Sequence, residues 1–395
     1  MISVADPRKH GNYIWVPASC HGVAFGVARV AGMTRIFLSS TFIFLFLTLT
    51  FPGALSARVV NVYNWAYAIA PDILTQFEKE TGIQVNYDVY DSSEVMETKL
   101  LAGSSGYDVV GLTVWPDLAR QLGANLYQPL NLSLIPQAKG VNPSFLTRMK
   151  AVDPDNRFAL PSIWGTRGFA FNKRMIEERF PNAPRTSAAM LFDPAVVSRF
   201  ADCGVILIDS PLDVIPSVLS YLGKDPDSSS PDDLKLASAQ LIKVRPFIKK
   251  FQAVPSVGDL TSGDYCLVEG FSGELIRGQK LGKAAGMDIE YVIPQEGGAL
   301  WIDVFAIPQD APHVREAHAF INFMLRPEII ARVTNATDTA NCIPASLPFV
   351  EQKIRDNPLV YPPQEVVDTL YVDTTHAPRY ERMRSREWTR VKIGR

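Results

Sequence analysis

From residue 58 onward, short apolar runs alternate with segments whose apolar residues recur every three or four positions. The first run, residues 59–65, predicts a strand. A helix should begin at Pro71 and end at Gly82, and residues 83–89 should form a second strand. Because strands alternating with amphipathic helices are typical of a mainly parallel sheet flanked by helices, we expect an α/β fold.

The same pattern continues along the chain. Further strands are predicted at 107–112, 205–208 and 301–308, and further helices at 214–222, 234–249 and 314–325. Asp91, Ser92 and Ser93 offer caps for another helix, whose apolar residues are Val95, Leu100 and Leu101. A second α/β unit should begin near 164–171, and the basic, proline-punctuated stretch after Tyr361 should wrap helices over one unit. A chain of 395 residues is long enough for two such units.

The N-terminal segment has the features of a secretory signal peptide. Arg35 precedes the apolar run 36–51, and Pro52-Gly53 then leads to small residues ending at Ala57. The alternative, a membrane anchor, is disfavoured because the run is shorter than the roughly 20 apolar residues that a span needs. We expect residues 1–57 to be an extension and a signal peptide that starts at Met33 and is cleaved after Ala57, so that the protein is exported to the periplasm.

The charge of the chain limits the kind of partner it can bind, and its cysteines could form a disulfide. The chain has 39 basic and 41 acidic residues, which excludes a broad nucleic-acid-binding face. Removal of residues 1–57 takes away four basic residues and one acidic residue, so the mature chain has a net charge of −5 and weakly favours cationic partners. Cys203, Cys266 and Cys342 remain: either two of them pair, with Cys203 and Cys266 in neighbouring strands, or all three are buried free thiols.

Aromatic and acidic residues gather where predicted strands end. In sheets of this type the loops after the strands converge on the ligand site. A cationic amine that enters a dry site loses hydration, which carboxylates and the faces of aromatic rings replace. Taken singly, each of these residues has an ordinary alternative role in the core or as a helix cap. The candidates are Trp65, Tyr67, Thr113, Asp213, Phe271, Glu274, Trp301 and Asp303.

Motifs of catalysis, phosphate binding and metal binding do not stand out in the sequence. It has no G-x-S-x-G elbow, no P-loop and no H-E-x-x-H, and its histidines lack the spacing of metal ligands. Cys342 is the only candidate nucleophile, and no histidine lies near it in sequence. We therefore expect a binding protein without cofactor or metal rather than an enzyme.

Seven stretches resemble the polyamine-binding periplasmic proteins of ABC transporters, and most closely the putrescine-binding members. They are YNW at 63–65, IAPD at 69–72, FEKETGI at 77–83, YLGKDP at 221–226, DVFA at 303–306, YPP at 361–363 and WTRVK at 388–392. The resemblance covers essentially the whole mature chain. It implies a two-lobed periplasmic solute-binding protein of type II, hinged by crossing strands, with lobe 1 at 58–162 plus about 305–338 and lobe 2 at 163–304 plus about 339–395.

The resemblance also implies roles for single residues. It implies a Cys203–Cys266 disulfide and a polyamine, putrescine or spermidine, held between the lobes and delivered to an ABC permease by a monomer. Rings at Trp65, Phe271 and Trp301 would enclose the methylene chain. Asp303 matches the family's carboxylate, and Glu274 and Asp213 conserve acidic character where the family has Asp and Glu.

Departures from the family at four positions leave the solute open. Ala66, Tyr67 and Ala68 stand where the family has a hydroxyl residue, an acid and a tyrosine, and Thr339 replaces a tyrosine, with Asp338 beside it as a compensating acid. Arg167 is either a clamp for a ligand carboxylate or a solvated arginine. The alternatives are therefore the same fold binding another cationic amine or an amino acid, or a ligand sensor in place of a transport subunit.

Overall fold

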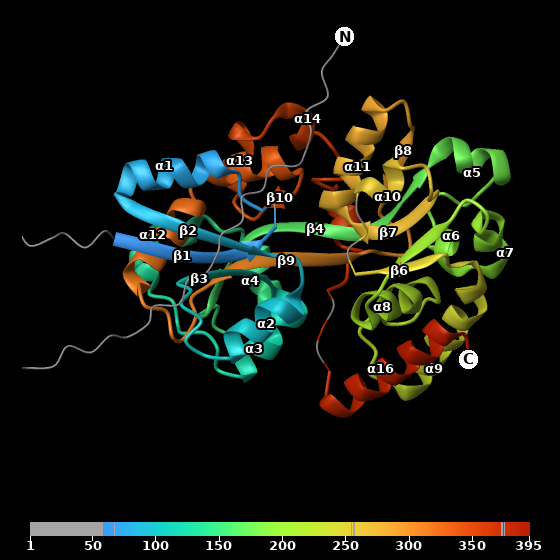
Figure 1. Cartoon of the computed structure of the whole chain (residues 1–395), viewed down its shortest axis with the longest axis horizontal. Coiled ribbons are helices and arrows are strands. Elements are labelled where there is room, and N and C mark those ends of the chain that lie inside the picture. Colours follow the sequence, from blue (N-terminus) through green and yellow to red (C-terminus); the bar gives the residue numbers. More distant parts are fainter. Residues whose placement is uncertain (1–57, 67, 254, 256, 373, 375) are drawn as a thin grey trace, which may run out of the picture. The chain divides into compact units, whose positions relative to one another are not determined.

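The computed structural model describes residues 58–395 except 67, 254, 256, 373 and 375, so the predicted signal peptide lies outside the described residues. The strands form one sheet in the order β2-β1-β3-β9-β4-β7-β5-β6, and β8 and β10 each pair with β4 (Figure 1). Their bounds are β1 Arg58–Trp65, β2 Ile83–Tyr90, β3 Val109–Thr113, β4 Ala159–Asn172, β5 Val205–Ile208, β6 Lys250–Gln252, β7 Leu267–Phe271, β8 Ile289–Val292, β9 Ala299–Ala306 and β10 Ala340–Asn341.

The sheet is mixed, which corrects the expectation of a mainly parallel one. The outer pairs β1–β2, β1–β3, β5–β6 and β5–β7 are parallel. The central pairs β3–β9, β9–β4 and β4–β7 are antiparallel. All 14 residues of β4 are buried, and β9 runs beside it through the middle of the sheet (Figure 1). These two strands therefore connect two parallel α/β units, and they are the crossing strands that the resemblance implied.

In the helices before β5, proline, glycine and serine residues mark where the helix begins or ends. Pro71 is the first residue of α1, and Gly82 ends the helix with a left-handed φ of 66°. Ser92 caps α2 by accepting a hydrogen bond from the Val95 amide. The buried face of α2 consists of Met96 and Leu100, whereas the expected core residues Val95 and Leu101 are more than half exposed. These helices are α1 Pro71–Thr81, α2 Ser93–Leu101, α3 Ala119–Gly123, α4 Pro143–Met149, α5 Lys173–Arg179, α6 Ala189–Phe192 and α7 Pro194–Val197.

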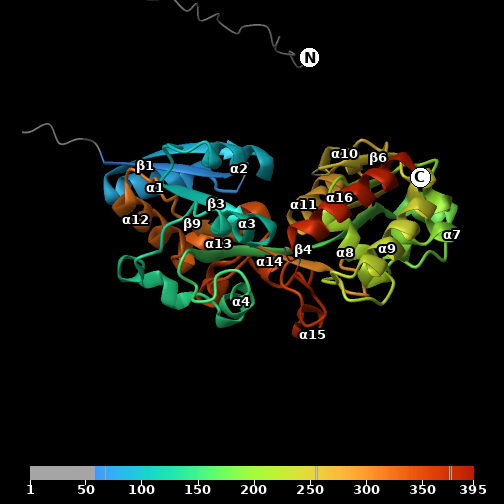
Figure 2. The ribbon, with the colours of Figure 1, turned by 90° about the horizontal axis from the view of Figure 1, so that it is seen from below.

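The later helices lie where they were predicted, but α8 and α9 each begin three residues earlier than expected, at Pro211 and Pro231. Helix α9 ends at Val244 rather than 249, because Pro246 has no amide hydrogen with which to continue it, and residues 245–247 form a 3-10 turn instead. Helix α16 packs against α9 (Figure 2), so the predicted C-terminal wrapping is present. The bounds are α8 Pro211–Tyr221, α9 Pro231–Val244, α10 Val257–Thr261, α11 Ser272–Ala284, α12 Val314–Met324, α13 Pro327–Thr337, α14 Gln352–Arg355, α15 Gln364–Val367 and α16 Pro378–Ile393.

Two separate hydrophobic cores hold the fold together. In the first, the ring of Phe77 from α1 packs edge-on against Phe320 and Phe323 of α12. The second contains Phe171 of β4 and Trp388 of α16. The first core also contains Ile206 of β5 and Leu275 of α11, so it continues across the crossing strands into the second α/β unit. The residue boundaries of the lobes remain a prediction. Among the helices that the structure describes, none is both long and apolar enough to cross a bilayer.

The Cys203–Cys266 disulfide is confirmed. The two Cα atoms lie 5.5 Å apart, and the bridge closes 63 positions of sequence. Cys203 lies two residues before β5, Cys266 directly precedes β7, and these strands pair in parallel. The bond therefore fastens the start of two neighbouring strands in the second core. Cys342 carries a free, buried thiol.

Candidate functional site

Strand register places several predicted residues on one face of the central sheet. Thr113 of β3 lies opposite Asp303 of β9, and Trp301 lies opposite Gly165 of β4. Further along β4, Arg167 pairs with Phe271 at the end of β7. Residues that pair across a sheet, and residues two apart on one strand, point to the same side. We call Thr113, Arg167, Phe271, Trp301 and Asp303 the site face.

Asp303 is the acidic centre of the site face. Its Oδ1 accepts a hydrogen bond of 2.7 Å from the Thr113 hydroxyl. Burial raises the pKa of Asp303 to about 7, an effect that the Thr113 hydrogen bond opposes and the nearby negative charge of Asp117 reinforces. The residue is half-buried, so its carboxyl group is shielded but not sealed from the surface. Such a carboxylate is stabilised when a cation takes the place of the missing water.

The indole of Trp301 lies against the backbone of the neighbouring strand. A β-carbon built on Gly165 would come within 2.4 Å of the Trp301 ring and 2.5 Å of the Ser272 hydroxyl. The Trp301 indole N–H also donates to the carbonyl oxygen of Thr166 over 3.3 Å. Glycine at 165 therefore permits the close approach of the ring to the strand, two residues from Asp303.

Trp65 reaches the same region through Tyr90. The two rings lie 4.4 Å apart, and the Tyr90 hydroxyl donates to the carbonyl oxygen of Gly111. The pKa of Tyr90 is raised well above its usual value, first by burial and then by the negative charge of Asp303, so Tyr90 lies within electrostatic reach of that carboxylate. The Trp65 indole N–H is buried and has no acceptor among the described residues. Tyr67, the other candidate in this loop, lies outside the described residues.

The acids of the second α/β unit differ in their partners. Asp213, in the first turn of α8, forms an ion pair of 2.6 Å with Nη1 of Arg167. Arg167 is only 3% exposed, so the interpretation as a solvated arginine is wrong. Glu274, in the first turn of α11, is half-buried and has neither a hydrogen-bond nor an ion-pair partner in the described part of the chain. Of these two acids, Glu274 is therefore the better placed to accept an ammonium group.

Thr339 is buried and is bonded locally. Its hydroxyl lies 2.6 Å from that of Thr337, and its methyl group would lie 2.9 Å from a β-carbon on Gly273. Thr339 therefore contacts the start of α11, next to Glu274. Asp338, which was considered as a compensating acid, instead forms an ion pair with Lys280 of α11.

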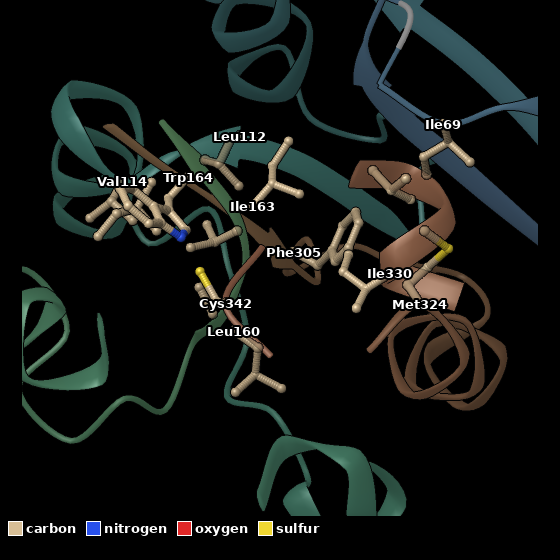
Figure 3. Close-up of a cluster of buried hydrophobic side chains, with 14 of the residues drawn as sticks. Ile69, Leu112, Val114, Leu160, Ile163, Trp164, Phe305, Met324, Ile330 and Cys342 are labelled. Carbon is tan, nitrogen blue, oxygen red and sulfur yellow. The ribbon is translucent and has the colours of Figure 1, made fainter. Parts of the chain in front are cut away.

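A small cavity opens beside Asp303. Its apolar wall includes Ile69, Ile163 and Met324, which Figure 3 shows among the buried side chains of this region. Its polar lining consists of the side chains Asn64, Ser162 and Asp303. The cavity is small, with a volume of only about 20 Å³, which is room for one or two water molecules. The cavity can hydrate the Asp303 carboxyl group, but it is too small for a polyamine.

Cys342 lies deep among apolar side chains, with Leu160 and Trp164 near it in Figure 3. Burial raises the pKa of its thiol well above the usual value, and the nearby negative charge of Asp303 adds to the effect. A nucleophilic cysteine needs its thiolate form, which this environment disfavours. The candidate nucleophile is thus held as an inert thiol.

Two polar residues of the site, Asp117 and Tyr90, were not predicted from the sequence. Asp117 is almost fully buried, and burial raises its pKa to about 6, although the Ser93 hydroxyl and Arg120 stabilise its charge. Tyr90 ends β2, and its position at a strand end was the available signal. Asp117 follows the end of β3 by four residues and could have been found by the same rule. In the part of the chain that is described, no three histidine, cysteine or acidic residues are grouped to hold a metal ion.

Two α/β units joined by crossing strands, with acids and rings where the strands meet, define a solute-binding protein. Residues 72–361 match the family described as bacterial extracellular solute-binding protein, and the chain belongs to this family. It is 40% identical over 349 residues to the putrescine-binding periplasmic protein PotF of Escherichia coli, covering 87% of this chain and 94% of that protein. It is 39% identical over 341 residues to the putrescine-binding periplasmic protein SpuD of Pseudomonas aeruginosa, covering 86% and 93%.

A solved structure of PotD, the spermidine/putrescine ABC transporter substrate-binding protein of Streptococcus pneumoniae, has the same fold. The TM-score is 0.75 at 28% identity, covering 85% of this chain and 99% of that one. The predicted fold class and family are thus confirmed. These relatives are named as binding proteins, and the chain is a binding protein rather than an enzyme.

Proposed function

We propose that this protein captures a polyamine of the putrescine or spermidine type outside the cytoplasm and delivers it to an ABC transporter. The observation that carries this proposal is the half-buried Asp303 carboxyl group, held by Thr113 and placed two residues from the Trp301 ring. The identity of about 40% to two putrescine-binding proteins over most of both chains supports the same solute class.

The chemistry of the site suits an alkyl diammonium ion. Asp303 binds one ammonium group and Glu274 a second, while the rings of Trp65, Phe271 and Trp301 contact the methylene chain. A cation beside an aromatic face gains roughly 0.5 to 2 kcal/mol, more when it is dry. Thr113 orients Asp303, and Tyr67, Asp213 and Thr339 complete the lining of the site. Closure of the two lobes about β4 and β9 would bury the solute and present the closed form to the permease.

The cellular arrangement follows from the same proposal. Several relatives are named as periplasmic proteins, and the segment up to Ala57 supplies a signal for export, so the mature protein acts in the periplasm. We propose that it works as a monomer and that its partner is the permease of an ABC transporter.

Calorimetric titration of protein purified from the periplasm tests the proposal. Putrescine or spermidine should bind at pH 8, and Asp303→Asn should weaken binding by at least about a hundredfold, because a buried charge-assisted hydrogen bond is lost. Binding to the unaltered protein should weaken as the pH falls below 7, because protons compete with the ammonium group for Asp303. Asp155→Asn, at an exposed position, is the matched control. The absence of any binding of either amine at millimolar concentration would refute the proposal.

A further inference from the structure

Arg167 is an unusual residue for the inside of a cation-binding protein. It lies in the middle of the fully buried strand β4 and is 3% exposed. Its Nη1 donates to Oδ1 of Asp213 over 2.6 Å, and its Nη2 donates to the backbone oxygen of Asp213 over 2.7 Å. One guanidinium thus binds both the side chain and the main chain of a single acid at the start of α8.

The surroundings of Arg167 keep this ion pair in place. Nη2 also donates to the Tyr371 hydroxyl over 3.4 Å, which lies 3.3 Å from the Ser217 hydroxyl. Glu269, 2% exposed, lies on the same side of the sheet and lines the same small cavity as Arg167. Burial raises the pKa of Glu269 to about 7, while the charge of Arg167 acts to lower it. A guanidinium keeps its charge at every relevant pH, so Asp213 is neutralised whatever the protonation of Glu269.

Register gives the spacing between this ion pair and the acidic centre of the site face. Asp303 pairs with Ile163, and Ala299 pairs with Arg167. The level of Asp303 and the level of Arg167 are therefore four residues apart along β9. That separation corresponds to about 13 Å. Five covalent bonds separate the nitrogens of a four-carbon diamine, and at about 1.5 Å each they span less than about 8 Å. Nine bonds separate the outer nitrogens of a spermidine-type triamine, which lie about 11 Å apart when the chain is extended. A hydrogen bond of about 3 Å from the far ammonium group then reaches the level of Arg167.

We propose that Arg167 is a specificity-determining residue of this site: by neutralising Asp213 it removes the carboxylate that the far ammonium group of a triamine would need, so the protein prefers diamines. This inference rests on the proposed function, since it assumes that an amine binds at Asp303. A diamine bound at Asp303 spans less than about 8 Å and so ends short of the level of Arg167. A triamine does reach it, and there it meets a carboxylate whose charge is already balanced.

The same contacts argue against Arg167 as a clamp for a ligand carboxylate. Both terminal nitrogens are directed at Asp213, so a ligand carboxylate would have to displace an acid of the protein itself. A four-carbon ω-amino acid, which carries one ammonium and one carboxylate group, distinguishes the two roles. Under our proposal it binds more weakly than putrescine, because it has no second ammonium group for Glu274.

The experiment measures dissociation constants for putrescine, spermidine and the ω-amino acid by calorimetry. In the unaltered protein putrescine should bind most tightly. Arg167→Gln removes the charge and keeps a donor for Asp213, and it should improve spermidine binding relative to putrescine by about tenfold, the effect of one additional charged hydrogen bond. Adding Asp213→Asn to Arg167→Gln should abolish that gain, which a purely structural effect of Arg167 would not produce. Arg167→Lys should retain the preference for putrescine.

Two further variants keep the test decisive. Arg167→Gln combined with Glu269→Gln avoids leaving Glu269 as a buried acid without its neighbouring cation, and it replaces the single variant if that variant does not fold. Arg179→Gln removes an arginine of the surface ion pair with Asp202 and should leave all three affinities unchanged. Failure of the unaltered protein to bind either amine would overturn the proposed function. Binding of putrescine with an unchanged affinity ratio in the folded Arg167 variants, or tightest binding of the ω-amino acid, would overturn only the role of Arg167.

Discussion

Replacing Asp303 by asparagine should stabilise the ligand-free protein above neutral pH while it weakens capture of the amine. The pKa of Asp303 rises from 3.8 to about 7 on folding, mainly through burial. A carboxyl group whose pKa is raised by folding binds its proton more tightly in the folded state. Its contribution to stability is therefore fully present below about pH 4 and is lost as the pH rises through 7.

The magnitude follows from the shift. Three pKa units at 1.36 kcal/mol each correspond to about 4 kcal/mol when the group is fully ionised. Because Asp303 is only half-buried and water can reach it, we expect about 2 kcal/mol. Asparagine has nearly the same shape and keeps an oxygen that accepts the Thr113 hydrogen bond, so the substitution removes the charge without leaving a cavity.

Scanning calorimetry of both proteins without ligand at pH 5 and pH 8 measures the effect. Asp303→Asn should have the higher melting temperature at pH 8, by about 2 to 5 °C for a chain of this size, and a smaller advantage at pH 5. The control Asp155→Asn should show no such dependence on pH. If the melting temperature of Asp303→Asn exceeded that of the unaltered protein equally at the two pH values, or if the variant were less stable at pH 8, burial would not destabilise the Asp303 carboxylate.

Two further predictions concern packing and covalent structure. Gly165→Ala should lower stability by about 1–3 kcal/mol and weaken amine binding, because the new β-carbon would displace the Trp301 ring. Chemical denaturation measures the stability, and calorimetric titration measures the binding. Gly123→Ala is the control and should change neither quantity, because a β-carbon on Gly123 would have no atom within 4 Å. Replacing Cys203 and Cys266 together by alanine should cost on the order of 4 kcal/mol, because the bridge closes a long loop of the unfolded chain. Chemical denaturation of the folded variants tests it, and a loss below about 1 kcal/mol would contradict this reasoning.

The sequence by itself determined the elements whose signals are local. Pro71 and Gly82 define the two ends of α1, and Ser92 caps α2, because these residues act on backbone groups within one turn of themselves. The alternation of strands and helices was sufficient for the fold class. The same pattern could not give the antiparallel centre of the sheet, because strand direction depends on which distant segments pair.

Only the tertiary structure decided which candidate residues meet and what charge they carry. The Thr113–Asp303 hydrogen bond joins residues 190 positions apart. The raised pKa of Asp303 depends on the atoms that exclude water from it. Asp213 read as a free acid in the sequence, yet Arg167, 46 positions away, neutralises it. Periodicity reports which side of an element is apolar, whereas the partner of a charged group is set by long-range packing.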